Sequence, residues 1–160
     1  MRTNRSRLTV AATVGLLFTT ALLAQGDNPH VGMWKANVAR SKYAPGTAAR
    51  KSTTKIEAAG MGIKASIDTD YVDGTQGHWT FTANYDGKDS PITGNCPYGE
   101  TVALTRVDPR TSTSVYKHNG MTTVTQTAVI SPDGKTRTVT ATGKNLKGQA
   151  LDNVTVFDRQ

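Results

Sequence analysis

The stretch 30–46, HVGMWKANVARSKYAPG, decides how the rest of the chain is interpreted. It holds Gly32-Met33-Trp34 at the start of a long run of strand-like segments. A large flat side chain such as Trp34 can plug the narrow end of a β-barrel, and a glycine just before it lets the backbone pass close to the ring. Gly32 and Trp34 are therefore predicted to close one end of a barrel.

The longer pattern around that tripeptide is more specific. Gly32-Met-Trp-Lys-Ala-Asn37 is followed by Ser41-Lys-Tyr43 and then by Pro45-Gly46. This pattern resembles that of small secreted bacterial proteins described as lipocalin-like, and the resemblance covers most of the chain after residue 30. It implies a barrel of the lipocalin and fatty-acid-binding type, without implying a ligand. In those families a basic residue from near the chain's end covers the tryptophan, which gives that role to Arg159 here.

Short segments of alternating apolar and polar residues, separated by turn dipeptides, fill the chain after residue 47. Asp-Gly and Asn-Gly supply the positive φ angles of tight hairpins that join antiparallel neighbours. Such dipeptides stand at Asp73-Gly74, Asp86-Gly87, Asn119-Gly120, Asp133-Gly134 and Lys147-Gly148. Strands are predicted near 31–37, 50–59, 62–72, 77–86, 88–92, 100–107, 111–118, 121–131, 135–144 and 149–158. These segments predict an all-β fold, a single antiparallel up-and-down barrel of about 8–10 strands, with a helical turn in 38–46 crossing one end.

The inward faces of these strands carry mostly small residues. On the fourth predicted strand Trp79, Phe81, Ala83 and Tyr85 share one face, and Phe157 is the other large inward residue. The last strand is apolar on both faces. Few large inward side chains indicate a lumen that the protein does not fill, and hence a ligand cavity. The alternative is a flattened barrel or sandwich packed on itself.

A small hydrophobic or amphipathic molecule in the lumen is the favoured partner. Its predicted lining is Trp79, Phe81, Tyr85 and Phe157, and Arg106 or Arg137 is expected to meet a carboxylate on it. No cofactor and no catalytic residue is assigned, and a monomer is expected.

An export signal is predicted at residues 1–24, followed by the barrel domain at 25–160. Arg2, Arg5 and Arg7 precede an apolar stretch that ends in small residues. An uncleaved anchor helix is the alternative. Cleavage removes three of the 19 basic residues and none of the 12 acidic ones, so the net charge falls from +7 to +4. The mature protein is expected to be periplasmic or secreted, without stable membrane insertion and without a nucleic-acid partner.

Residues that carry chemistry are few and scattered. No hydrolase elbow, phosphate-binding loop or His-Glu-x-x-His occurs, and the acidic run from Asp68 to Gly74 has the wrong spacing for a calcium loop. The three histidines lack metal-ligand spacing, although each alone could be a haem ligand. An enzyme on the barrel scaffold would have to use His78, Tyr85, His118 or Cys96.

A basic run supports a third possible function, besides ligand binding and catalysis: an envelope or surface protein that binds an anionic polymer. Between residues 35 and 57 the chain has six basic residues and only one acidic residue, Glu57. The basic residues are Lys35, Arg40, Lys42, Arg50, Lys51 and Lys55. They could attract an acidic head group or an anionic envelope polymer, or they could simply form a solvated face.

Overall fold

Ten strands make up most of residues 28–160, the part of the chain that the structure, a computed structural model, describes. They are β1 (Gly32–Ala36), β2 (Ala49–Ala59), β3 (Gly62–Tyr71), β4 (Gln76–Asn84), β5 (Asp86–Gly94), β6 (Thr101–Asp108), β7 (Thr111–His118), β8 (Met121–Ile130), β9 (Thr136–Lys144) and β10 (Ala150–Arg159). One 3-10 turn, η1 (Val38–Arg40), follows β1. The predicted export signal lies outside the described residues. No helix within 28–160 is long and apolar enough to cross a membrane.

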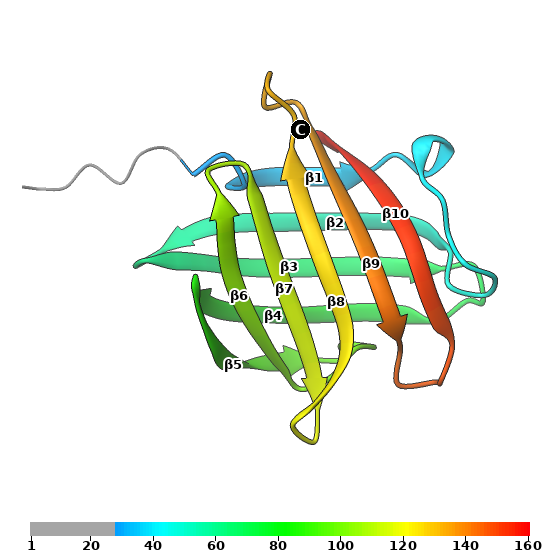
Figure 1. The fold of residues 1–160 in the computed structure, drawn as a ribbon. Helices are drawn as coiled ribbons and strands as arrows, with labels where there is room; N and C mark the ends of the chain where they lie inside the picture. The colour runs from blue at the N-terminus through cyan, green and yellow to red at the C-terminus, as the bar shows by residue number, and fades with distance from the viewer. Residues whose placement is uncertain (1–27) are drawn as a thin grey trace, which may run out of the picture.

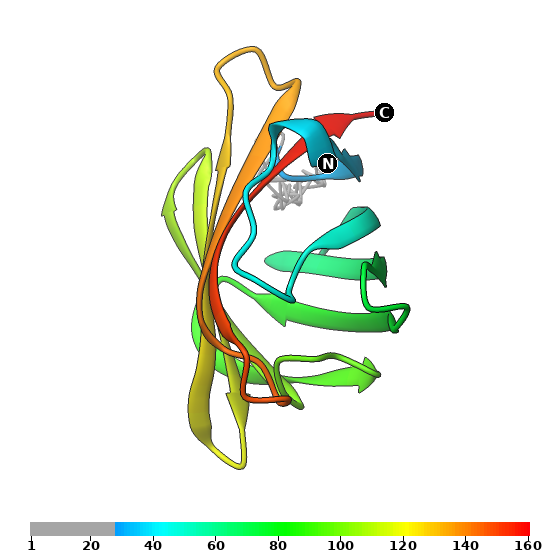
Figure 2. The same ribbon diagram turned by 90° about the vertical axis from the view of Figure 1, so that its right-hand side faces the viewer.

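The strands form one closed barrel. Each strand pairs antiparallel with the strands before and after it in the chain, and β1 pairs with β10 to complete the ring. Figure 1 shows β6–β10 crossing in front of β1–β5, and Figure 2 shows the same groups as two facing layers. The predicted fold class is confirmed, at the upper end of the expected strand number.

The predicted strand limits agree with the observed ones to within two residues at every end. The turn chemistry explains most of this agreement. Asn119 and Gly120, with φ angles of 49° and 75°, make the tight turn between β7 and β8. The helical turn expected within 38–46 is present as η1.

The turn at Asp86-Gly87 differs from the prediction because it is wide. β4 and β5 pair only at residues 79–81 and 92–94, well away from that dipeptide. Toward the turn the two strands separate, while Asp86 pairs with Thr105 of β6 on the other edge of β5. The β4–β5 seam is therefore the most thinly paired contact between consecutive strands in the described barrel.

Burial alternates along the strands as the sequence pattern predicts. On β4, Trp79, Phe81 and Ala83 are buried, while His78 and Thr82 are exposed. The double-sided apolar character of β10 has a separate cause. The segment 37–42 lies along the edge of β10 beyond its pairing with β1, where the backbone N–H of Val156 donates to Ser41 Oγ at 3.0 Å and Lys42 bridges Val154.

The connection 37–48 also reaches the lumen at the barrel end away from Trp34. Its backbone bridges β10 at Lys42 and Val154. Asn153 Oδ1 accepts hydrogen bonds from the Ala44 backbone N–H at 2.7 Å and from Thr47 Oγ1 at 3.0 Å. These contacts fix Tyr43, which lies between Lys42 and Ala44, at the lumen wall.

Trp34, Arg159 and Gly32 lie together at the other end. Trp34 is fully buried, and its Nε1 donates to the His30 carbonyl oxygen at 2.9 Å. The Arg159 guanidinium carbon lies 4.2 Å from the Trp34 ring centre. Its nitrogens donate at 2.7 Å to the carbonyl oxygens of Pro29, Val31 and Gly134. Gly32 has a φ of 144°, which residues with a side chain rarely adopt, and a Cβ there would also displace Arg159 Nη1.

Replacing Arg159 with methionine is expected to lower the free energy of unfolding by about 2 kcal/mol. The change removes three hydrogen bonds to carbonyls and the cation over Trp34, although the partial exposure of Arg159 weakens each of them. Urea unfolding followed by circular dichroism measures the loss. Arg50→Met is the matched control, since Arg50 is exposed on β2 with no side-chain partner among residues 28–160. Equal losses in the two variants would contradict a capping role for Arg159.

Candidate ligand-binding lumen

A cavity of about 100 Å³ lies inside the barrel. Its wall comes from β2–β4 on one side and β6–β10 on the other, with His30 and Tyr43 from connecting segments. Sites for drug-sized ligands typically measure about 300–1,000 Å³. Side chains therefore fill most of the lumen, and a small space is left in the middle.

Five of the six residues predicted to line the lumen border this cavity. They are Trp79, Phe81, Tyr85, Arg137 and Phe157. Arg106 lies outside, in a surface cleft at the Trp34 end, with its guanidinium carbon 4.3 Å from the Tyr85 ring centre. Tyr85 borders both spaces and separates Arg106 from the lumen. That the five residues bind a ligand remains a prediction.

Three tyrosines that the sequence pattern did not place also border the cavity: Tyr71, Tyr98 and Tyr116. The Tyr98 ring meets Trp79 edge-on at 5.9 Å between centres, and Tyr116 at 5.2 Å. Burial raises the pKa of Tyr98 to about 12 and raises those of Tyr71 and Tyr116 as well, so all three phenols are neutral. Because of these rings the lumen is fuller than the sequence indicated.

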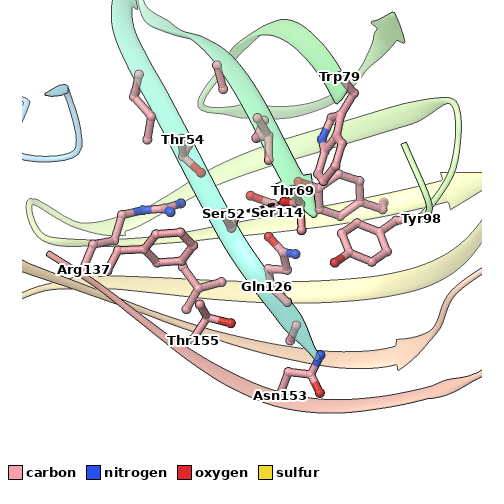
Figure 3. A pocket seen from close by; sticks show the side chains of 18 of the residues that line it. Ser52, Thr54, Thr69, Trp79, Tyr98, Ser114, Gln126, Arg137, Asn153 and Thr155 are labelled. Atoms are coloured by element: carbon pink, nitrogen blue, oxygen red, sulfur yellow. Dashed lines mark hydrogen bonds between the residues drawn. The ribbon is translucent and has the colours of Figure 1, made fainter. Parts of the chain in front are cut away.

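Polar side chains cross the middle of the lumen. Figure 3 shows Arg137 on one side, Trp79 and Tyr98 on the other, and Ser52, Ser114 and Gln126 between them. Ser52 Oγ and Thr69 Oγ1 share a hydrogen bond of 2.8 Å. Ser114 lies opposite Gln126 in the β7–β8 register. Ser52 lies on the same strand face as the buried Ile56, and this two-residue period could have predicted that the serine points into the lumen.

Arg137 is the cation of the lumen. On β9 it lies opposite Phe157 of β10, with its guanidinium carbon 5.6 Å from the Phe157 ring centre. The side chain is half-buried, its Nε is buried without a hydrogen-bond partner, and it borders the cavity. Burial lowers the pKa of Arg137 to about 10, so it stays charged at neutral pH. No carboxylate within residues 28–160 pairs with it.

His30 borders the same cavity and is 1% exposed. Burial, followed by the positive charges of Arg137 and Arg106, lowers the pKa of His30 to about 4, and Asp108 opposes this shift. The imidazole is therefore neutral at pH 7. Sequence reasoning did not place His30 at the lumen, because it lies in a turn where no strand alternation indicates which way it points.

Four buried polar atoms lack hydrogen-bond partners in the described part of the chain, and all four belong to residues that line this lumen. They are His30 Nε2, Tyr43 Oη, Trp79 Nε1 and Arg137 Nε. Trp79 Nε1 lies near the Tyr116 hydroxyl without reaching hydrogen-bond geometry. Each such group costs about 1–3 kcal/mol, and native interiors contain few of them. Their concentration around one cavity makes the lumen the candidate site.

The residues considered for catalysis lie in unrelated environments: His78, Tyr85, His118 and Cys96. His78 faces outward on β4 with Nδ1 2.5 Å from Asp68 Oδ1. His118 is exposed at the end of β7, with Nδ1 2.7 Å from Glu100 Oε2. Among residues 28–160, no three His, Cys, Asp or Glu side chains gather where they could hold a metal ion.

The single thiol, Cys96, is expected to be unreactive in the folded protein. Burial raises its pKa from 9.0 to about 11, which lowers the thiolate fraction about 100-fold near neutral pH. Labelling by iodoacetamide, followed by mass spectrometry, should therefore be about 100-fold slower in buffer than in guanidinium chloride. Similar rates in the two solvents would show that Cys96 is exposed.

The basic residues between 35 and 57 do not form a continuous positive face in the fold. Arg40 Nη1 lies 3.2 Å from Asp158 Oδ1, and Lys55 Nζ lies 2.9 Å from Glu57 Oε1. Strand pairing also places Lys35 opposite Asp158. Asp158 of β10 and Glu57 of β2 thus dilute the charge that would attract an anionic polymer.

Surface clefts lie at both ends of the barrel. The cleft at the Trp34 end measures about 830 Å³ and includes Arg106 and Arg159. The cleft at the other end measures about 240 Å³, and Lys147 Nζ spans it to reach Asp73 Oδ2 at 3.1 Å.

Comparisons with known proteins add little to this picture. No family model and no curated protein matches the sequence. Among solved structures the chain is similar to the zebrafish ileal bile acid-binding protein in complex with cholic acid. The two share 14% sequence identity with a TM-score of 0.46, over 82% of this chain and 99% of the zebrafish chain. Cholic acid is bound by the zebrafish protein in that complex.

Proposed function

We propose that this protein is an exported small-molecule-binding barrel whose lumen holds an amphipathic anion against Arg137. The observation that carries the proposal is the guanidinium of Arg137, which borders the cavity with its Nε buried and has no acidic partner among residues 28–160. Removing an ion from water costs several kcal/mol, and the Phe157 ring at 5.6 Å offsets only part of that cost. A carboxylate in the cavity would supply the missing counter-charge.

The neighbouring groups favour the same charge. His30 is neutral, so its ring can donate a hydrogen bond to an anion without adding a second buried cation. The described lumen wall contains no Asp or Glu that would repel an anion. Phe81, Phe157 and the ring of Trp79 supply the apolar surface that the rest of an amphipathic ligand needs.

Export is the second part of the proposal, and it rests on the sequence of residues 1–24. Its arginines, apolar stretch and small residues are typical of a secretory signal. A periplasmic or secreted monomer would meet its ligand outside the cytoplasm. Comparing the mass of protein purified from the periplasm with that of the full chain tests this part.

Binding is tested by titrating the protein with two carboxylates, benzoate and decanoate, each against its uncharged amide. Calorimetry gives the affinities, and the fluorescence of Trp79 reports occupation of the lumen. At least one carboxylate should bind about tenfold more tightly than its amide, because only the acid can pair with Arg137. Equal affinities for acid and amide, or no binding by any of the four, would overturn the proposal.

A further inference from the structure

The size of the cavity limits the class of ligand. A volume of about 100 Å³ is close to that of an engineered cavity of about 150 Å³ that holds benzene, and it is far below that of typical drug-sized sites. A single ring with small substituents matches this volume. A long alkyl chain or a fused-ring steroid would require the tyrosine-rich wall to move.

The unpartnered polar atoms divide between two ends of the lumen. Arg137 and His30 interact electrostatically at one end. Tyr43 and Trp79 belong to the other end, where both lie near Tyr98. Arg137 lies opposite Phe157, whereas Lys42, next to Tyr43, bridges Val154. Val154 and Phe157 are three residues apart on β10, which corresponds to about 10 Å of strand.

The chemistry of these atoms specifies what a ligand must offer. Arg137 Nε and Trp79 Nε1 can only donate hydrogen bonds, so the ligand must accept at both ends. Tyr43 Oη can donate or accept. An alkyl chain would satisfy neither Trp79 nor Tyr43 and would leave each of them at a cost of about 1–3 kcal/mol.

We infer that the lumen takes a compact, single-ring carboxylate that carries a second hydrogen-bonding group, with its carboxylate at Arg137 and its hydroxyl at Tyr43 and Trp79. This inference rests on the proposed function and narrows it to hydroxylated aromatic acids and molecules of that shape. The belt of Ser52, Ser114 and Gln126 lies between the two ends and suits the polar edge of such a ring.

The test compares benzoate, 3-hydroxybenzoate, 4-hydroxybenzoate and decanoate on the wild-type protein and on Tyr43→Phe, by calorimetry. The better hydroxybenzoate should bind about tenfold more tightly than benzoate in the wild type. In Tyr43→Phe that ratio should fall toward one, and a ratio that stays near ten would contradict the role of Tyr43. The circular dichroism spectrum and urea unfolding of the variant show that it is folded.

Three results would overturn the inference, and they differ in what they say of the proposed function. Tighter binding of decanoate than of every aromatic acid, with decanamide still weak, would refute the ring-sized class and leave anion binding standing. Absence of binding by all four acids would refute both. Equal affinities for benzoate and both hydroxybenzoates in the wild type would show that water satisfies Tyr43 and Trp79.

Discussion

Replacing Arg137 with methionine is expected to abolish carboxylate binding and to stabilise the free protein. Methionine keeps a long apolar stem and removes a buried cation that has no acidic partner in the described barrel. Affinity for the best carboxylate should fall about 100-fold, because the anion would then be buried without a counter-charge. The free energy of unfolding should rise by about 2 kcal/mol, the range in which relieving buried charge stabilises proteins.

Arg106→Met is the matched control for this experiment. Arg106 also stacks on an aromatic ring, at 4.3 Å from Tyr85, but it lies in the outer cleft. Its replacement should change affinity by less than about threefold and stability by less than about 0.5 kcal/mol. Urea unfolding and calorimetry on both variants give the comparison. An Arg137→Met protein that is less stable and still binds carboxylates would show that Arg137 is a structural residue.

His30 is expected to make the protein sensitive to mild acid. Its pKa is about 4 in the fold and near 6.5 in the unfolded chain, so the unfolded state binds more protons between these values. This contribution to stability is complete above pH 6.5 and is lost as the pH falls toward 4. Between pH 7.5 and pH 5 the loss should be about 2 kcal/mol, measured by urea unfolding across that range.

The variant His30→Gln isolates this effect, since glutamine does not titrate. Its stability should change little between pH 7.5 and pH 5. His118→Gln is the control, because His118 is exposed and paired with Glu100. The control should keep the acid sensitivity of the wild type. If His30→Gln keeps it too, the acid sensitivity does not come from His30.

The fold was predictable because its signals are local. Turn dipeptides such as Asn119-Gly120 set hairpins through their own φ angles, and alternation along β4 sets which side chains point inward. Neither signal requires knowledge of distant contacts. Asp86-Gly87 does not make a tight turn because β4 and β5 pair only at 79–81 and 92–94, and a turn dipeptide does not show how far its flanking strands stay paired.

The candidate site was predictable only in part. Alternation along a strand shows whether a side chain points into the barrel, but it does not show how far from the barrel end that side chain lies. Arg106 shares a strand face with Leu104, and Arg137 shares one with Val139. Yet Arg106 lies beyond Tyr85 in the outer cleft, and Arg137 borders the lumen. His30 and Tyr98 come from segments without periodicity, so only the folded chain places them at the cavity.

The closing of the ring by β1 and β10 has a consequence for self-association. In an open sheet the outermost strands present unpaired N–H and C=O groups to which another chain can add. Each of the ten described strands instead has a neighbour on both sides. Pairing is short only where β4 meets β5 and where the five-residue strand β1 meets β10 and β2. Strand addition, the common first step toward amyloid-like assembly, is therefore restricted to these short seams.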